Sequence, residues 1–529
     1  MKVNRGWLLL PLGLALLQLA ALSRSATVTD DAWISLQHAR NLVEGHGLIF
    51  QVGERVEGFT NPLWTLLGAG LLAVGASPTL GLRLLGALAW LGLLATCAAH
   101  LRDSGVRSSI SIAVCCVVAA SPALVYWSQS GLETVAFAAA AAEATRWATR
   151  AAREGGRAWA WTGVFGATAA LLRPEGVAWG GLLLLGAAYF AWRAGRLRGG
   201  GLGGPLVGLL VFALPVLGYE VFRLAYYGAW LPNTFYAKVG GEAGVALRGL
   251  RYLGRVATET PTALLLLPAL LAPRSLLRPA ALLPAGLLAF HALYLVAVGG
   301  DYMELARFGV PAVALSAFVG GIAAEAVAQR GGAVLRLGGP IWLTMGLLMG
   351  LPAWAPGTLL RDGDHEVARY EDVGRWLREH TPEETLVATP AVGAIAWESG
   401  RRLVDTIGIT DPNVARYRSE AYVVTGPAGH TRSNVGYVLD RAPDLILLAN
   451  VWLRPVPLRA EHLLANPRLL TPTDRFLFGE PRFFADYEIA SWRLEDGRWL
   501  GAALRRGGTM DPDRPGFEGR RPDDRVRGR

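Results

Sequence analysis

The chain consists mainly of long apolar blocks that are separated by short polar loops. Blocks such as 279–298 reach the roughly 20 residues that a helix needs to cross the hydrocarbon core of a bilayer. On this pattern we expect about eleven membrane spans. They lie near 7–23, 79–101, 109–127, 132–149, 158–172, 176–192, 203–222, 257–272, 279–298, 307–325 and 338–354. One further apolar block, 61–76, either crosses as well or remains at one surface.

Arginine clusters decide between these alternatives. Lys2 and Arg5 place the N-terminus on the inner side, because positive charge is retained there. If 61–76 does not cross fully, the later basic clusters also fall inside. These clusters are Arg102 with Arg107, 146–157, 193–198, Arg274 with Arg278, and Arg330 with Arg336. We therefore expect 61–76 to be a re-entrant or interfacial helix. The first block could be a cleaved signal peptide, but the many blocks that follow favour a retained helix.

The pattern changes after the last apolar block. Residues 1–356 form the expected membrane domain, which includes a first outer loop at 24–60. Residues 357–505 are rich in charge and turn residues. A helix at 365–380 and strands at 385–389 and 444–450 predict a small α/β domain there. Residues 506–529 combine Pro, Gly and charge, which predicts a disordered basic tail.

The fold class expected from this pattern is an all-α membrane protein with a small extracytoplasmic α/β domain. Eleven spans place that domain outside a plasma (inner) membrane that the chain crosses many times.

Composition supports a membrane protein and excludes several other classes. The chain is 52% hydrophobic and 18% charged, with a mean hydropathy of +0.33, whereas soluble domains carry about 25% charged residues. The net charge of +9 comes from clusters between apolar blocks, which argues against a nucleic-acid partner. Cys97, Cys115 and Cys116 all lie inside apolar blocks, so neither a disulfide framework nor a cysteine metal site is expected.

The first outer loop carries two adjacent acids, Asp30 and Asp31. Apolar residues recur behind them at helical spacing, at Trp33, Leu36, Ala39 and Val43. This spacing predicts an amphipathic helix along the membrane surface, with both acids at its N-terminal end. The acids could simply cap the helix and complement its dipole. Alternatively, they could supply a general base or organise a metal ion. At a helix N-terminus both carboxylates should stay ionised.

Further charged residues lie at the outer ends of spans. Glu133 begins one span, and Arg173 and Glu175 separate two others. Charges at this depth usually face a cavity or a partner. Glu133 and Arg173 could pair with each other. Alternatively, the planar guanidinium of Arg173 could neutralise a substrate phosphate.

Two more outer loops have similar polar residues. The aromatic loop 231–238 could be an interfacial anchor, or it could present Lys238 to a phosphate. After a glycine pair, Asp301, Glu304 and Arg307 form either a satisfied ion-pair network or part of a site. No nucleotide-binding, zinc or Ser–His–Asp pattern is visible. An outward-facing site without such a pattern favours a lipid-bound donor.

Taken together, these motifs resemble a known membrane family. The segments are TDDAWISLQHARNLVEGHGLIFQVGERVEGFTNPLW, SGLETVAF, LLRPEG, YYGAWLPNTFYAKVGG, GGDYMELARFGVP and RRLVDTIGITDPNVAR. They are similar to bacterial C-type glycosyltransferases that use polyprenyl-phosphate sugars, in particular terminal β-(1→2)-arabinofuranosyltransferases and their uncharacterised relatives. The resemblance covers about 30–430. The stretch 33–36 departs from the usual aromatic-and-arginine pattern.

The resemblance implies an enzyme that transfers a sugar from a polyprenyl-phosphate carrier to a glycan or lipid acceptor on the outer face of the membrane. It places catalysis at the acidic motif, Asp30 and Asp31, without deciding between the two. For the donor phosphate we expect contacts from Arg173, Lys238 and Arg307. Other cavity candidates are Glu57, Glu133, Glu175, Asn233, Tyr236, Asp301 and Glu304. A divalent cation is possible, although no cofactor or metal-ligand set is indicated.

A transporter or flippase of a lipid-linked glycan is the alternative function. Transporters concentrate their charges near the bilayer midplane and often contain repeated halves. This sequence instead places its charges at the ends of spans and has no visible repeat.

Overall fold

The computed structural model describes residues 9–22, 28–197, 201–238, 244–330, 344–346, 348, 365–417, 432–451, 453–465, 470–510 and 526–527. The expected span at 338–354 lies outside the described residues, apart from 344–346 and 348. Most of the expected tail beyond 510 also lies outside them.

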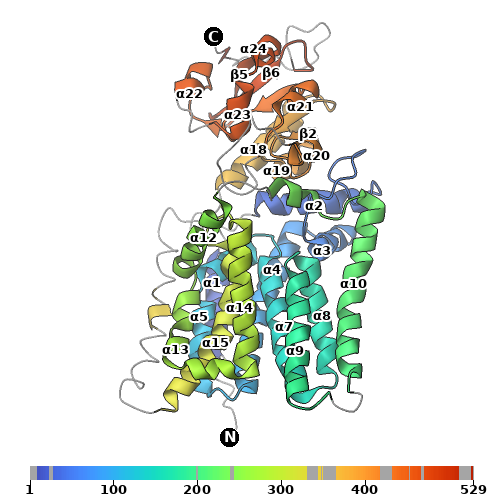
Figure 1. Ribbon diagram of the computed structural model, residues 1–529. Helices are drawn as coiled ribbons and strands as arrows, with labels where there is room; N and C mark the ends of the chain where they lie inside the picture. Colours follow the sequence, from blue (N-terminus) through green and yellow to red (C-terminus); the bar gives the residue numbers. More distant parts are fainter. Residues whose placement is uncertain are drawn as a thin grey trace.

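Apolar helices run side by side and form a bundle (Figure 1). They are α1 (Leu9–Leu22), α4 (Pro78–Asp103), α5 (Ser108–Ala119), α6 (Pro122–Gln129), α7 (Thr134–Glu154), α8 (Ala158–Leu172), α9 (Gly176–Arg193), α10 (Gly203–Tyr227), α13 (Thr262–Leu271), α14 (Pro279–Val298) and α15 (Val310–Ala328). Each overlaps an expected span, and α5, α6 and α13 each cover only part of one; the expected span at 257–272 begins inside another helix, which ends at Glu259. Among the described residues, four helices are long and apolar enough to cross a membrane, or five if α5 and α6, bent by 55°, form one span.

Glycines allow these helices to approach each other closely. A Cβ atom on Gly86 of α4 would lie 2.1 Å from the carbonyl oxygen of Ser128 in α6. A Cβ atom on Gly163 of α8 would lie 2.4 Å from the carbonyl oxygen of Gly208 in α10. Small residues at such crossings are typical of membrane helices, which associate through close packing rather than through the exclusion of water.

Two helices at one end of the bundle do not follow its axis. Helix α2 (Asp30–Val43) lies across that end, beneath the α/β unit (Figure 1). The expected helix is present, and Trp33, Leu36 and Ala39 are buried as predicted, whereas Val43 is exposed. Polar residues of α2 are buried as well (Ser35, His38 and Asn41), so the helix is enclosed on more than its apolar face.

Helix α3 (Pro62–Ala73) has 12 residues and is therefore about 18 Å long. The hydrocarbon core is about 30 Å thick. Helix α13, within an expected span, is shorter still, so length alone does not distinguish α3 from a span, and the re-entrant or interfacial helix at 61–76 stays a prediction.

Short elements complete this end of the bundle. They are α11 (Asn233–Lys238), the amphipathic helix α12 (Val245–Glu259) and the 3₁₀ turn η3 (Arg307–Gly309), while η2 (Pro273–Leu277) connects α13 to α14.

The α/β unit contains a seven-stranded sheet of order β2-β1-β3-β6-β5-β7, with β4 paired to β6. The strands are β1 (Leu386–Thr389), β2 (Arg402–Asp405), β3 (Leu445–Leu447), β4 (Leu453–Arg454), β5 (Tyr487–Arg493), β6 (Trp499–Arg505) and β7 (Val526–Arg527). The helices are α18 (His365–His380), α19 (Gly393–Ser399), α20 (Pro412–Ala415), α21 (Val435–Asp440), α22 (Ala460–Ala465), α23 (Pro472–Leu477) and α24 (Pro481–Asp486). The predicted helix at 365–380 is confirmed, and strands form within the two predicted ranges, at Leu386–Thr389 and, shorter than expected, at Leu445–Leu447.

Residues assigned to the tail contribute to this unit. Met510 is buried, and β7 pairs with β5. Disorder of the remaining tail stays a prediction, because 511–525 and 528–529 lie outside the described residues.

The edge of the sheet that faces the bundle determines where the site forms. Strands β1, β2 and β3 are parallel, so their carboxyl ends meet at one edge. Helix α19 follows β1, and the loop 405–411 begins at the end of β2. Both contact the membrane part: α19 packs on α2, and the loop binds α11. Loops at this edge form the ligand sites of many α/β proteins.

Candidate active site

A cavity of about 390 Å³ lies where the ends of the apolar helices meet α2 and the α/β unit. Most of the charged residues singled out in the sequence line it. These are Asp31, Glu133, Arg173, Glu175, Lys238, Asp301 and Arg307. They come from loops that are far apart in the chain, and the expectation that these loops lie at the same end of the bundle is correct. Apolar side chains make up much of the remaining wall.

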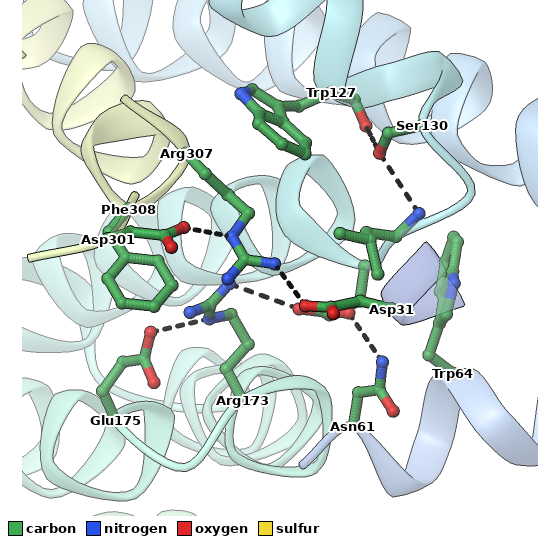
Figure 2. A network of polar contacts seen from close by, with 12 residues as sticks. Asp31, Asn61, Trp64, Trp127, Ser130, Arg173, Glu175, Asp301, Arg307 and Phe308 are labelled. Carbon is green, nitrogen blue, oxygen red and sulfur yellow. Dashed lines mark hydrogen bonds and ion pairs between the residues drawn. The ribbon is translucent and has the colours of Figure 1, made fainter. Parts of the chain in front are cut away.

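Arg307 connects two parts of the cavity wall. Its Nη1 lies 3.1 Å from Oδ2 of Asp31 at the start of α2. Its Nε lies 2.6 Å from Oδ2 of Asp301 in the loop after α14. The Arg307 residue is only 5% exposed, and Figure 2 shows its guanidinium between the two carboxylates. Since buried charges require partners, this arginine fixes the orientation of both acids.

Arg173 is also held by two acids. Its Nε lies 2.7 Å from Oε1 of Glu175, and its Nη1 lies 3.2 Å from Oε1 of Glu133. The amide of Asn61 donates a hydrogen bond of 2.7 Å to the other oxygen of Glu133. The ion pair that was considered between Glu133 and Arg173 is therefore present.

The ring of Phe308 contacts both arginines. It lies 4.6 Å from the guanidinium carbon of Arg173 and 5.0 Å from that of Arg307. Such cation–π contacts help to orient the guanidinium groups of both arginines. Figure 2 shows the two arginines side by side with Phe308 next to them.

The backbone before Arg307 adopts an unusual conformation. Leu305 and Ala306 have φ angles of 53° and 42°, in the left-handed region that residues with a Cβ rarely adopt. The loop is held by Trp127, whose Nε1 donates to the Leu305 carbonyl at 3.3 Å. Arg255 of α12 donates to the Met303 carbonyl at 2.9 Å. Strained backbone that is held in this way is typical of functional sites.

Lys238 differs from the two arginines. It is the last residue of α11, it is half-buried, and it lines the cavity. Within the described part of the chain, it takes part in none of the ion pairs or hydrogen bonds. Among the three cations that line the cavity, Lys238 is therefore the one whose ammonium has no carboxylate partner within the described residues.

The structure separates the two adjacent aspartates. Asp31 lines the cavity, whereas Asp30 turns toward the α/β unit. The carboxylate of Asp30 accepts hydrogen bonds from the amides of Ala394 at 2.8 Å and Gly393 at 3.2 Å. Burial, followed by the charge of Asp31, raises the pKa of Asp30 to about 7. A raised pKa departs from the expectation that a helix N-terminus keeps Asp30 fully ionised, because the loss of water outweighs the hydrogen bonds.

The remaining candidates do not line the cavity. Glu57 is bound by Arg223 at 2.6 Å, and it accepts a hydrogen bond of 2.7 Å from Tyr219. The ring of Tyr236 lies under the guanidinium of Arg416, at 4.5 Å. These contacts join the outer loops to α10 and to the α/β unit.

Two other candidates also lie outside the cavity. Asn233 donates to the carbonyls of Gly408 at 2.8 Å and Ile409 at 3.0 Å. Glu304 is exposed. Asn233 thus attaches the α/β unit to α11.

Some lining residues were not singled out in the sequence. Asn61, Tyr294 and Ile409 line the cavity. Asn61 lies immediately before the proline that begins α3, a local signal that could have been used. Ile409 comes from the α/β unit and reaches the cavity because Asn233 binds the adjacent backbone. Its position depends on tertiary contacts for which the sequence has no local signal.

Among the described residues, no group of three or more His, Cys, Asp or Glu side chains is arranged to hold a metal ion.

Comparison with known proteins extends this description. Residues 360–510, which include the α/β unit, match a family described as a domain of unknown function, DUF8728. The chain is 30% identical over 251 residues to a terminal β-(1→2)-arabinofuranosyltransferase of Corynebacterium glutamicum, covering 41% of this chain and 34% of that protein. It is 32% identical over 339 residues to the Mycobacterium tuberculosis protein of the same name, covering 55% of this chain and 52% of that protein. The matches thus span between a third and about half of the curated relatives.

Solved structures identify the fold. ArnT from Cupriavidus metallidurans in the apo state aligns with a TM-score of 0.60 at 13% identity, covering 95% of this chain and 98% of ArnT. The crystal structure of ArnT bound to undecaprenyl phosphate aligns with a TM-score of 0.56, also at 13% identity and with the same coverage. The chain has the C-type glycosyltransferase fold. The resemblance predicted from the motifs is therefore confirmed, in sequence by the arabinofuranosyltransferases and in fold by ArnT.

Proposed function

We propose that the protein is a membrane glycosyltransferase that moves a sugar from a polyprenyl-phosphate donor to a glycan or lipid acceptor of the cell envelope. We place this reaction at the outer face of the plasma membrane, with the α/β unit outside. The main support is one arrangement: Asp31, Arg307 and Lys238 line the same cavity at the ends of apolar helices. A carboxylate and cations in this position can act on a phosphate-linked sugar at the membrane surface.

In the proposed reaction, an acceptor hydroxyl oxygen attacks the anomeric carbon of the donor sugar. The bond from that carbon to the phosphate oxygen breaks, and the carrier phosphate leaves with the bonding electrons. Asp31 takes the proton of the hydroxyl group as general base. Asp31 is favoured over Asp30 because Asp31 lines the cavity, whereas the Asp30 carboxylate is occupied by two amides of α19.

The three candidate cations take different roles in this proposal. Arg173 and Arg307 are each neutralised by two carboxylates, while Lys238 has no such partner among the described residues. Lys238 therefore provides the main contact to the leaving phosphate, whose charge grows as the bond breaks. Arg307 orients Asp31, and Arg173 holds Glu133 and Glu175 in the adjacent wall.

The comparisons support the substrate class. ArnT, which shares the fold, has been solved with undecaprenyl phosphate, and the curated relatives are named as arabinofuranosyltransferases. A polyprenyl-phosphate pentose, arabinofuranose first, is therefore the donor to test before hexoses. Nothing that we observe favours a transporter or flippase. The α/β unit lies over one end of the bundle (Figure 1). The charged side chains that line the cavity come from loops and helix ends at that end, which differs from the midplane sites of transporters.

The test uses the purified protein in lipid nanodiscs with a panel of polyprenyl-phosphate pentoses and hexoses and a cell-wall glycan acceptor. Release of polyprenyl phosphate and mass gain of the acceptor are measured. We expect release with at least one donor and a loss of about 100-fold or more in Asp31→Asn, the range for a lost general base. Glu495→Gln, at an exposed turn between β5 and β6, serves as the control. Unchanged turnover in Asp31→Asn would overturn the assignment of the base.

A further inference from the structure

Helix α19 of the α/β unit contacts α2 along one face. Asp30 accepts hydrogen bonds from the Gly393 and Ala394 amides, at the first turn of α2. One turn later, the ring of Trp33 packs 5.2 Å from the ring of Trp397. Arg40 lies two turns further on. Its guanidinium carbon is 4.2 Å from the centre of the Trp397 ring, and its Nη1 donates to the backbone carbonyl of Trp397 at 3.1 Å. Positions 30, 33 and 40 share one side of an α-helix, so α19 contacts α2 over three turns.

The two helices meet at backbone distance where α2 begins. A Cβ atom on Gly393 would lie 2.1 Å from the Asp30 carbonyl oxygen and 2.9 Å from its Oδ1. Only glycine fits at this position. The first amides of a helix have no acceptor within that helix, and the Asp30 carboxylate satisfies two of them. Asp30 is thus fixed both by its side chain and by contact of its backbone.

The residue that follows faces the cavity. Asp31 is held from the other side by Arg307, at 3.1 Å. The beginning of α2 is therefore fixed between α19 and Arg307, with Asp30 contacting one and Asp31 the other. A small rotation of α2 about its axis would move the Asp31 carboxylate relative to Arg307. A displacement of about 1 Å in a catalytic group can reduce a rate by about 100-fold.

We propose that Asp30 is a positioning residue, through which the α/β unit sets the direction of Asp31. The proposal rests on the proposed function, in which Asp31 is the general base. It gives the α/β unit a part in catalysis, since α19 supplies the amides that fix α2. Asp30 itself touches neither donor nor acceptor.

Other contacts attach the α/β unit independently of Asp30. The Gln51 side chain donates to the Leu403 carbonyl at 2.8 Å and accepts from the Leu403 amide at 2.6 Å. Asn233 donates to the Gly408 carbonyl at 2.8 Å. The unit should therefore stay attached when the Asp30 contact is altered. A loss of turnover in an Asp30 variant would therefore come from a change in the position of Asp31 and not from detachment of the α/β unit.

The experiment compares Gly393→Ala and Asp30→Asn with Gly436→Ala. Gly436 lies in α21, and an added Cβ atom there meets nothing closer than 4.0 Å. Polyprenyl-phosphate arabinofuranose serves as the donor, and released polyprenyl phosphate is measured with the full-length protein. We expect kcat to fall about 10- to 100-fold in Gly393→Ala and to fall in Asp30→Asn. The donor KM should stay within about twofold, and Gly436→Ala should match the wild type.

A double-mutant cycle distinguishes positioning from general damage. If Gly393→Ala acts through Asp31, it should not reduce the residual turnover of Asp31→Asn any further. An equal reduction in both backgrounds would overturn the proposal, and so would a normal kcat in Gly393→Ala with an inactive Asp31→Asn. If Asp31→Asn alone keeps its turnover, the general-base assignment fails and the positioning role fails with it.

Discussion

Arg307 and Asp31 lie 3.1 Å apart although 276 positions separate them in the chain. The pairing joins the start of α2 to the loop that follows α14. Because Arg307 also binds Asp301 at 2.6 Å, one guanidinium holds two carboxylates from different parts of the molecule. A planar group with several donors can satisfy both, whereas a single ammonium cannot do so with the same geometry.

Replacement of Arg307 should affect both stability and turnover. Arg307→Gln leaves the buried carboxylate of Asp301 and the half-buried carboxylate of Asp31 without their cation, and breaking a buried pair costs about 3–5 kcal/mol. We expect a lower thermal midpoint and near-complete loss of transfer. Arg307→Lys keeps the charge but loses the planar set of guanidinium donors that contacts both carboxylates, so this variant should remain folded with reduced turnover. Thermal unfolding in detergent and phosphate-release assays measure both effects. Normal turnover in Arg307→Gln would show that Asp31 needs no partner.

Lys238 should affect donor use without affecting stability. It has no ion pair among the described residues, so Lys238→Gln breaks none of those contacts. We expect the donor KM to rise about tenfold or more, because a charge-assisted contact to phosphate is lost. Lys238→Arg should recover much of the affinity. Arg251→Gln, at an exposed position of α12, is the control. An unchanged donor KM in Lys238→Gln would place the phosphate elsewhere.

Asp30 should make stability depend on pH. Its pKa is about 7 in the folded protein and about 3.9 in an unfolded chain. The folded state therefore binds the proton of Asp30 more tightly than the unfolded chain does. The stability that this proton contributes is complete below about pH 4 and is lost as the pH rises through about 7. We expect the thermal midpoint of the wild type, relative to Asp30→Asn, to fall between about pH 4 and pH 7 and to change little at higher pH.

The comparison with Asp30→Asn removes the contribution of other buried acids. Asp405 and Asp474, for example, have pKa values raised to about 6 by burial, but both are present in the two proteins. A difference between wild type and Asp30→Asn that does not change with pH would contradict the raised pKa of Asp30.

Ala306 offers a test of the backbone conformation before Arg307. Its φ of 42° is unfavourable for a residue with a Cβ, by about 1–2 kcal/mol. Ala306→Gly removes this strain, while the greater freedom of glycine in the unfolded chain costs about 0.5–1 kcal/mol. We expect an unchanged or slightly higher thermal midpoint. Ala257→Gly, at an exposed helical position of α12, should instead lower it. A lower midpoint in Ala306→Gly would show that the methyl group matters more than the strain.

The sequence predicted which helix ends carry the charged residues, because apolar blocks and arginine clusters define the ends of spans. It could therefore anticipate that Glu133, Arg173 and Arg307 lie at the same end of the bundle. It could not separate Asp30 from Asp31, since adjacent residues have the same composition and context. What separates them is α19, whose position depends on folding of a region more than 350 residues later.

Other contacts that the sequence did not predict also depend on tertiary packing. Glu57 pairs with Arg223 of α10, which lies one residue beyond the span expected at 203–222 and was not singled out in the sequence. Ile409 reaches the cavity through the attachment of its loop to Asn233. Hydrophobic periodicity defines elements one at a time, whereas these contacts depend on how elements from different parts of the chain are placed together.

The origin of Ile409 and α19 in the C-terminal third has a consequence for biosynthesis. Asp31 emerges from the ribosome early, but the elements that enclose it are made only after the membrane helices that the structure describes. The cavity is therefore completed only after these helices, once the α/β unit has folded onto α2 and α11. A partly inserted chain has the acidic motif but lacks part of the wall, so the cavity is incomplete until α19 and the loop 405–411 have been made.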